Sequence, residues 1–586
     1  MPKSRAPNSL RSSRIDSKPR LTECLTDPLV TGFQMPTADL IIENASILTM
    51  DPENPRAEAL AVQGNRIIAV GNATSIEPLA DHTTKRIDAQ GCTVLPGLVE
   101  AHMHLFWGGY GLKLLQLTGV KGLDQLAPRL RAYADANPTE GLLICKAADY
   151  NLFGDGKHTT RQDLDAALSD RPVILLSSDH HTAWANTIAL EKAGILYGAK
   201  MPVGCEVVMA DDGTASGELR EQFAYAPVLA LRTSGGREDL GFAGLEPSTP
   251  PTAEEREEDL DTLRKGLEYC ASFGFTSLHN MDGNFYQLEL LRELERRGEL
   301  ICRTEVPFHL TPEKPVSSIS DALEMRERYS TDRLRSGRIK MFMDGVIDSG
   351  TAFMFEPFTD GSTCEPLHTA ERFNKICIEA DKHGLQISVH SIGDAAVRRT
   401  LEGYEAARKT NGPRDSRHRV EHIEVMHPDD LHRFAELSVI ASVQPSHPPL
   451  AMDFPRDPWA AMVGEDRLKH AFPDKALREA NVPIAFSSDW PITDINPMRS
   501  VKAAMTRPKL SDDCPDNTCT LHEALHAYTS GGAYAGFDED RLGMLKAGML
   551  ADLVIMDSNL EDLPIDVLDQ AKARTTIVDG QIVWGV

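Results

Sequence analysis

The sequence predicts an α/β protein whose central unit is a (β/α)8 barrel. Three observations predict this fold class. Eight short apolar segments of strand character are spread through the middle of the chain, helical patterns lie between most of them, and polar residues follow several strand ends. Strands that alternate with helices are typical of parallel sheets and of barrels, in which the chemistry gathers at the carboxyl ends of the strands.

The expected barrel strands share an apolar core bounded by turn residues. They are residues 98–105, 275–281, 301–309, 338–344, 386–391, 418–424, 438–443 and 484–488. Between them lie helical patterns such as "TAEEREEDLDTLRKGLEYCASF" and "AERFNKICIEADKHG", with apolar residues at helical spacing. We therefore assign residues 96–105 and 251–540 to the barrel.

Both ends of the ordered chain have the pattern of β-structure. Residues 38–95 contain "ADLIIENASILTM" and "ALAVQGNRIIAVG", and residues 541–586 contain "ADLVIMDSNL" and "ARTTIVDGQIVWGV". The alternatives are two small β units or one discontinuous β-sandwich. We favour the single sandwich because each flank alone has few strands with which to close a core.

A long insertion separates the first expected barrel strand from the second. Residues 106–250 contain strand patterns, "LLICKAAD" and "PVILLSSD", and helical patterns, "RQDLDAAL" and "NTIALEKAG". We expect an inserted α+β subdomain. Because it follows the carboxyl end of the first strand, it should lie near the barrel mouth.

Composition limits the possible partners. The 586 residues carry a formal net charge of −26, which repels phosphate backbones and argues against nucleic acid. No apolar run reaches the roughly 18 residues of a spanning helix, so no membrane partner is expected.

Ten cysteines without a C-x-x-C pair indicate a reduced, cytoplasmic protein. Residues 1–37 are rich in basic residues, Ser and Pro, which favours a disordered tail over a transit peptide.

The stretch "GLVEAHMH" raises the question of a metal site. In a strand, residues two apart face the same side, so His102 and His104 point together and Met103 points away. Two such imidazoles can share one cation, and with a carboxylate they suit zinc or another divalent transition metal. The H-x-H pattern alone is weak evidence, because core histidines can alternate in the same way.

Further metal-capable residues stand near the ends of other expected strands. They are Lys340, Asp344, His390, His422 and Asp489. Singly, His390 could be a buried or capping histidine, and Asp489 could cap a helix or a turn. Their joint recurrence at strand ends predicts an inward-facing ring of metal ligands.

The chain resembles the amidohydrolase superfamily, and within it the YtcJ-like branch (amidohydrolase family 3) that includes N-substituted formamide deformylases. The stretches that carry the resemblance are "VLPGLVEAHMHL", "RPVILLSSDHHTAWANTIAL", "IKMFMDGVIDSGTAFM", "ISVHSIGDAAV", "VEHIEVMHPDD", "SSDWPITDINPM" and "LGMLKAGMLADLVIMD". The resemblance covers about residues 38–586. It implies a barrel with a flanking β-sandwich and a centre of one or two metal ions.

The resemblance also implies a role for each ring residue. His102, His104 and Asp489 would hold one ion, His390 and His422 a second, and an N6-carboxylated Lys340 would bridge the two. An unmodified ammonium has no lone pair for a cation, so Lys340 could instead form an ion pair with Asp344. Asp344 would then be a neighbouring carboxylate that supports the ligands.

The expected reaction is hydrolysis of a carbon–nitrogen bond in a non-peptide amide, N-substituted formamides included. Zinc ions would lower the pKa of water, Asp489 would act as ligand and general base, and His390 or His422 would help to polarise the carbonyl. Alternatives are a cyclic amide, a lactone or another ester as substrate, and, more remotely, a metal-free scaffold protein. No G-x-S-x-G or nucleotide-binding motif competes with these.

Substrate contacts are expected from the loops after the strands and from the insertion. The candidates are His181, Trp107, Phe353, Gln444 and Trp490, with Phe106 and Met354 nearby in the sequence. The aromatic ones could equally be packing residues, and His181 could belong to a capping turn. The partner is a small molecule, and a homodimer is the default assembly.

Overall fold

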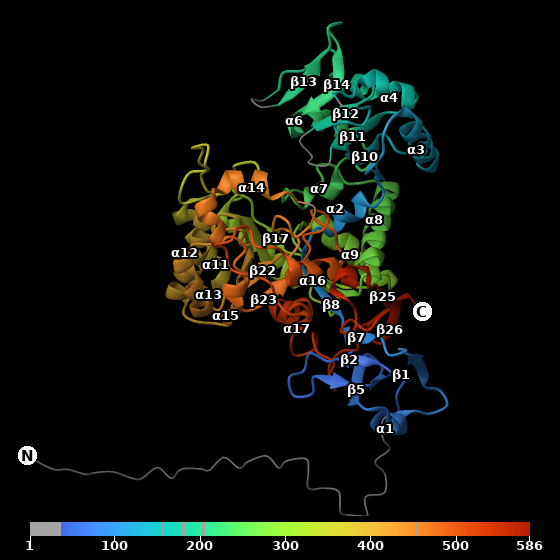
Figure 1. Ribbon diagram of the computed structural model, residues 1–586, viewed down its shortest axis with the longest axis vertical. Helices are drawn as coiled ribbons and strands as arrows, with labels where there is room; N and C mark the ends of the chain where they lie inside the picture. Colours follow the sequence, from blue (N-terminus) through green and yellow to red (C-terminus); the bar gives the residue numbers. More distant parts are fainter. Residues whose placement is uncertain (1–36, 155, 178–181, 202–204, 453, 586) are drawn as a thin grey trace, which may run out of the picture.

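The computed structural model describes residues 37–154, 156–177, 182–201, 205–452 and 454–585. Residues 1–36 lie outside this range, and with them nearly all of the predicted tail. Figure 1 shows a mixed α/β molecule with a β-rich unit at one end, a parallel α/β unit in the middle and a second small α/β unit at the other end.

The β-rich unit consists of two sheets. One has the order β5 (Arg66–Gly71), β4 (Ala59–Gln63), β1 (Leu40–Glu43) and β6 (Lys85–Asp88). The other has the order β26 (Gln581–Gly585), β25 (Ala573–Val578), β24 (Leu553–Met556), β7 (Thr93–Pro96), β2 (Ser46–Leu48) and β3 (Arg56–Ala57). The short helix α1 (Ala73–Ile76) follows β5.

Strands from the two ends of the chain share the second of these sheets. Strand β24 pairs antiparallel with β7, so the sheet is continuous across more than 450 residues of intervening sequence. Ile47, Val94, Leu553 and Ile577 are fully buried in one apolar cluster. Burying these alternating apolar faces together is the physical reason that both flanks meet.

Parallel strands form the centre of the middle unit, in two sheets. The four-stranded sheet has the order β18 (Leu334–Arg335), β16 (Arg303–Glu305), β15 (Phe275–Asn280) and β8 (Leu98–Met103). The six-stranded sheet has the order β17 (Phe308–His309), β19 (Arg338–Phe342), β20 (Gln386–Ser391), β21 (Arg419–His422), β22 (Ile440–Val443) and β23 (Ile484–Phe486). A strand lies within each of the eight predicted segments, at shorter bounds in most of them.

The predicted single strand 301–309 is two strands in the structure. Strand β16 pairs with β15 and β18, whereas β17 pairs with β19 in the other sheet. Pro307 lies between them and has no backbone N–H to donate to a neighbouring strand, which explains the interruption. This segment therefore links the two sheets covalently.

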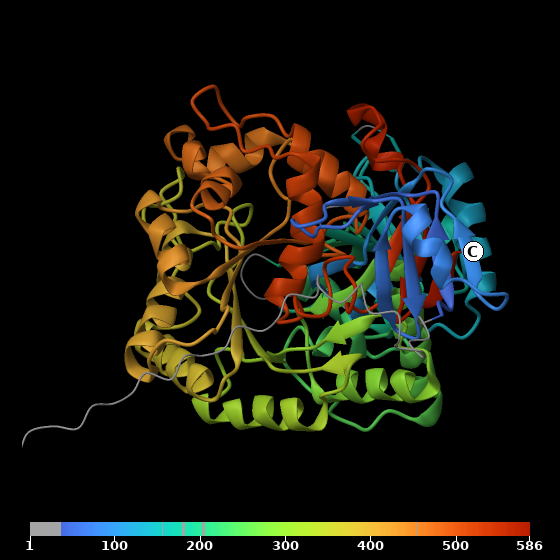
Figure 2. The same cartoon turned by 90° about the horizontal axis from the view of Figure 1, so that it is seen from below.

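Helices cover the outer side of the parallel strands, as Figure 2 shows. They include α8 (Ala253–Ser272), α9 (Phe285–Arg297), α10 (Ile319–Arg328), α11 (Ala370–Lys382), α12 (Asp394–Asn411), α13 (Leu431–Leu437), α14 (Arg456–Val463), α15 (Asp474–Glu479), α16 (Pro497–Thr506), α17 (Leu521–His526) and α18 (Gly532–Ala535). Helix α8 begins at a capping box formed by Thr252 and Glu255, and it buries Leu260, Leu263 and Leu267 against the strands.

Residues 115–229 form the second small α/β unit. Its six-stranded sheet has the order β13 (Glu206–Met209), β14 (Ala215–Arg220), β12 (Thr182–Ala185), β11 (Val173–Ser177), β10 (Leu143–Ala148) and β9 (Leu115–Gln116). Helices α3 (Leu123–Ala136), α4 (Arg161–Ala167), α5 (Thr187–Lys192) and α6 (Gln222–Leu229) pack with it.

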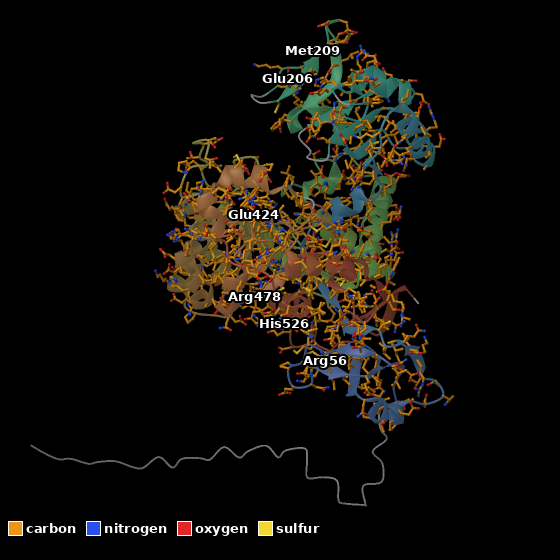
Figure 3. All side chains as sticks on the ribbon, in the orientation of Figure 1. Arg56, Glu206, Met209, Glu424, Arg478 and His526 are labelled. Atoms are coloured by element: carbon orange, nitrogen blue, oxygen red, sulfur yellow. The ribbon has the colours of Figure 1, made fainter. Side chains whose placement is uncertain are left out.

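The three units follow one another along the long axis of the molecule. In Figure 3, Glu206 and Met209 mark the far tip of the inserted unit, Arg56 marks the β-rich unit, and Glu424 lies between them. Helices α2 (Leu105–Gly111) and α7 (Arg237–Leu240) stand where the chain leaves and re-enters the middle unit. The insertion thus starts directly after the carboxyl end of β8.

Candidate metal centre

The H-x-H stretch ends strand β8, and its side chains divide as the strand period requires. His102 and His104 are 1% and 4% exposed and both reach Asp489, whereas Met103 is fully buried in the apolar core. The backbone N–H of Asp489 donates to the carbonyl of His102 at 2.9 Å. The segment after β23 is therefore fixed against the end of β8.

Asp489 presents one carboxylate oxygen to each of two histidine pairs. Its Oδ1 lies 3.4 Å from His102 Nε2 and 3.2 Å from His104 Nε2. Its Oδ2 lies 3.7 Å from His447 Nε2 and 4.0 Å from His422 Nδ1. Asp489 has a φ of +59°, a left-handed backbone that costs energy for a non-glycine residue and is often found at functional sites.

Hydrogen bonds at Nδ1 of three of these imidazoles fix the orientation of the rings. His102 Nδ1 is 2.7 Å from Glu421 Oε2, His104 Nδ1 is 2.9 Å from Asp282 Oδ1, and His422 Nδ1 is 2.9 Å from the amide oxygen of Gln444. These oxygens accept, so each Nδ1 carries a proton. Histidines that bind metals are supported in this way.

The donor set fits a cation. Asp489 Oδ1, His422 Nε2 and His447 Nε2 are buried without a hydrogen-bond partner among the described residues. Unsatisfied buried polar atoms are costly unless something pairs with them. Two groups of side chains have ligand atoms close enough for one ion: His102, His104 and Asp489, and His422, His447 and Asp489. Imidazole nitrogen and carboxylate oxygen are suitable ligands for zinc.

Lys340 lies beside this centre but does not pair with Asp344. Its side chain is fully buried, and its Nζ has no hydrogen-bond partner in the part of the chain that the structure describes. Burial lowers the pKa of Lys340 to about 8. Asp344 instead accepts backbone N–H groups of Phe353, Ile392 and Gly393, and burial raises its pKa to about 7.

His390, at the end of β20, is held in a different way. Its Nε2 donates to the carbonyl of Gly345 at 2.9 Å and lies 4.0 Å from Asp344 Oδ1. Its ring lies against Phe342, with centroids 4.7 Å apart, and against His422, with centroids 4.5 Å apart. His390 thus borders the centre without facing Asp489 as closely as His447 does.

Electrostatics at the centre concentrate negative charge on Asp489. Burial opposes ionisation, but the charges of His102 and His104 hold the pKa of Asp489 well below its usual range. Burial also lowers the pKa of His104, but Asp282 and Asp489 outweigh it and raise the value to about 9. Burial and Lys340 lower the pKa of His102 to about 4.

The predicted substrate residues lie in different environments. Trp107 is half-buried with its ring 6.0 Å from that of His104. Trp490 is buried and packs with the apolar core, and Phe353 packs against that core with its ring under Arg399. Both polar ends of the Gln444 side chain are used, on His422 and on Ser487. His181 lies outside the described residues.

Several residues of the site were missed in the sequence. His447 stands four residues after β22, and Asp282 stands two residues after β15, at the same edge of the sheets. That position at a strand end was the available signal for both. Glu421 gave no such signal, because its contact with His102 joins strands more than 300 residues apart. Phe242, whose ring centroid lies 5.3 Å from that of His104, comes from the end of the insertion.

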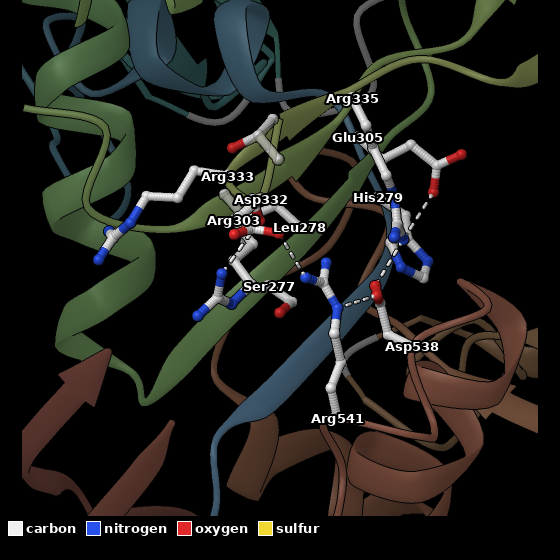
Figure 4. Close-up of a pocket in the computed structure, with 11 residues that line it drawn as sticks. Ser277, Leu278, His279, Arg303, Glu305, Asp332, Arg333, Arg335, Asp538 and Arg541 are labelled. Carbon is white, nitrogen blue, oxygen red and sulfur yellow. Dashed lines mark hydrogen bonds and ion pairs between the residues drawn. The ribbon is translucent and has the colours of Figure 1, made fainter. Parts of the chain in front are cut away.

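A second polar hollow in the middle unit is structural. Figure 4 shows Arg303, Arg333, Arg335 and Arg541 around a cavity of about 10 Å³. Each guanidinium faces a carboxylate, for example Asp538 between Arg335 and Arg541 at 2.6 and 2.8 Å. With its charges paired and so small a volume, this hollow offers no room for a substrate.

The fold and this centre define a metal-dependent hydrolase, and comparison with known families identifies the family to which it belongs. The model of the amidohydrolase family matches residues 85–584, so the chain belongs to that family. This confirms the resemblance seen in the motifs. Among the described residues, none of the helices combines the length and the apolar character that crossing a bilayer requires.

Curated relatives span nearly the whole chain. Protein LONG AFTER FAR-RED 3 of Arabidopsis thaliana is 29% identical, over 90% of this chain and 88% of its own. "Putative amidohydrolase YtcJ" of Bacillus subtilis is 26% identical, over 92% and 98%. N-substituted formamide deformylase of Arthrobacter pascens is 24% identical, over 92% and 97%.

A solved structure shares the fold. An uncharacterized metal-dependent hydrolase from Pyrococcus furiosus aligns with a TM-score of 0.68 and 27% identity, over 88% of this chain and 98% of its own. The likeness therefore includes the parallel unit and both smaller units.

Proposed function

We propose that this protein is a metal-dependent hydrolase that cleaves the carbon–nitrogen bond of a small non-peptide amide, with N-substituted formamides as the first substrates to test. One observation carries the proposal. Asp489 is a buried carboxylate whose Oδ1 has no hydrogen-bond partner among the described residues, and that oxygen lies 3.4 and 3.2 Å from Nε2 of His102 and of His104. The similarity to the N-substituted formamide deformylase of Arthrobacter pascens supports the substrate class.

We also propose that the two parallel sheets are arcs of one eight-stranded barrel. The segment 303–309 belongs to both sheets. At the other side, backbone hydrogen bonds from Asp489 to His102 and from His104 to Trp490, at 2.9 and 2.8 Å, link the end of β8 to the chain after β23. A closed barrel would place the histidines of the candidate metal centre together at the mouth formed by the carboxyl ends of its strands.

Zinc is the metal that we propose, with His102, His104, His422 and Asp489 among its ligands. Bound there, it would supply a Lewis acid and lower the pKa of water for attack at neutral pH. The residues themselves supply proton transfer and orientation. Asp489 Oδ1 can accept a proton at its unpartnered position and return it to the leaving nitrogen. Glu421 and Asp282 keep the imidazoles in one tautomer.

Carboxylation of Lys340 is part of the proposal. Its Nζ is buried and without a hydrogen-bond partner over the described ranges, so a free amine is available to add carbon dioxide with loss of a proton. The carbamate would replace a repelling ammonium by an anion beside the cations. Mass spectrometry of the intact native protein, or a crystal structure, would test this modification.

The ring of aromatic side chains beside the histidines supports a small, partly apolar substrate. Phe242 lies 6.2 Å from Trp107 and 5.5 Å from Phe342, measured between ring centroids. Together they form an apolar wall next to His104.

A homodimer stays a proposal as well, and light scattering after size-exclusion chromatography would test it.

An activity screen tests the function directly. Zinc-loaded protein should hydrolyse at least one of the N-formyl amines, N-acyl amino acids or cyclic amides, and Asp489→Asn should remove that activity. The matched control is Asp430→Asn, a buried carboxylate that binds Arg398 and Arg433 away from the histidines. Turnover of lactones alone would contradict the choice of bond, and no turnover with a fully metallated protein would contradict the hydrolase function.

A further inference from the structure

A buried arginine contacts the carboxylate that holds His102 in place. Arg419 and Glu421 are two residues apart on β21, so their side chains point to the same side of the strand. The guanidinium is fully buried, with Nε 2.8 Å from Glu421 Oε1 and Nη2 3.1 Å from Glu421 Oε2. That same Oε2 lies 2.7 Å from His102 Nδ1. We infer that Arg419 positions His102 through Glu421 and so sets how tightly the centre binds its metal; the inference rests on the zinc centre of the proposed function.

Other strands fix the guanidinium of Arg419. Its Nη2 lies 2.6 Å from the carbonyl oxygen of Ala101 on β8 and 2.8 Å from the hydroxyl of Ser442 on β22. Its Nη1 lies 3.2 Å from Nδ1 of His279 on β15. One planar group with five N–H donors therefore contacts four strands, β21 included. A lysine ammonium, which is a single charged atom, could not reach these partners together.

The geometry of Glu421 depends on this arginine. The carboxylate is fully buried, and a buried charge is unfavourable unless it is paired. Its Oε1 faces Arg419, and its Oε2 is shared between Arg419 and His102. Because a two-point contact with a guanidinium fixes both the position and the plane of a carboxylate, it also fixes Oε2 against the imidazole. Such support sets the orientation of a metal-binding histidine, and its loss typically costs about 10- to 100-fold in metal affinity.

Arg338 is the matched control. It is another fully buried arginine of the middle unit, on β19, and its carboxylate partner is Glu305 on β16. Its Nη1 lies 3.8 Å from the sulfur of Met281. Over the described residues, Arg338 makes no hydrogen bond or ion pair with Glu421 or with a histidine of the centre. Substitution of either arginine removes a buried guanidinium, but Arg419 is the one that contacts the partner of His102.

Zinc affinity, measured by competition with a chelator of known affinity, tests the inference on protein that circular dichroism shows to be folded. Arg419→Met should bind zinc about tenfold more weakly than wild type, and Arg338→Met should bind it as tightly as wild type. With cobalt in place of zinc, the visible spectrum should change in Arg419→Met and not in Arg338→Met, because it reports the geometry of the ligands. In a Glu421→Gln background, Arg419→Met should cause less than about a twofold further loss, because the path through the carboxylate is already broken.

Several outcomes would overturn the inference. Equal zinc affinity of Arg419→Met and wild type would do so, and so would a tenfold loss that persists in the Glu421→Gln background or appears equally in Arg338→Met. No zinc bound to wild type would overturn the proposed metal centre itself and the inference with it. If Arg419→Met does not fold, Arg419→Lys replaces it, because a single ammonium keeps the charge but cannot face both oxygens of Glu421. Weaker zinc binding is expected in that variant, and wild-type affinity would contradict the role of Arg419.

Discussion

The hydrogen bond between Asp282 and His104 gives the sharpest test of how the centre is supported. Asp282 is fully buried, and its Oδ1 lies 2.9 Å from His104 Nδ1. A hydrogen bond to a charged group contributes about 1.5 to 3 kcal/mol and a neutral one about 0.5 to 1.5. Asp282→Asn keeps the shape but removes the charge, so it should weaken zinc binding by about 1 to 2 kcal/mol, or about 5- to 30-fold.

Zinc affinity measured by competition with a chelator of known affinity checks this value. The control is Asp430→Asn, which removes the same charge from a buried carboxylate that binds Arg398 and Arg433. Circular dichroism should show both variants folded. Equal zinc affinity of Asp282→Asn and wild type would refute the reasoning, and an equal loss in Asp430→Asn would show a general effect of charge.

Three other changes have defined outcomes. Asp552→Ala should lower the free energy of unfolding, measured by urea titration, by about 3 kcal/mol, because it breaks the buried bidentate ion pair with Arg303 that joins β16 to the β-rich unit. A larger loss is not expected, since Asp579 still contacts Arg303. Phe242→Ala should lower kcat/KM about fivefold through KM, since about 1 kcal/mol of apolar contact is removed, and a change in kcat alone would contradict this. Burial raises the pKa of Asp381, but His418, Asn411 and Arg414 outweigh it and lower the value to about 2. This carboxylate therefore stabilises the fold above its unfolded pKa of about 4, and the contribution, about 1 kcal/mol after solvent screening, disappears as the pH falls toward 2. Asp381→Asn should flatten this part of the curve of unfolding free energy against pH.

Much of the fold could be predicted from local patterns. Short apolar segments bounded by turn residues marked the parallel strands, and helix α8 lies within one residue of its predicted range at each end. The prediction of one strand over residues 301–309 was wrong. Pro307 has no backbone N–H, and its effect on pairing depends on which neighbouring strand would need that donor, which only the sheet shows.

The sequence by itself determined the period that puts His102 and His104 on one face, the strand ends that carry His422 and Asp489, and the membership of the amidohydrolase family. These follow from spacing, which is local. Only the tertiary structure decided which partners meet across strands: Asp282 on His104, Glu421 on His102, Gln444 on His422, and His447 near Oδ2 of Asp489. Such contacts depend on strand order and register, because residues far apart in the chain become neighbours only when the parallel sheets align their carboxyl ends.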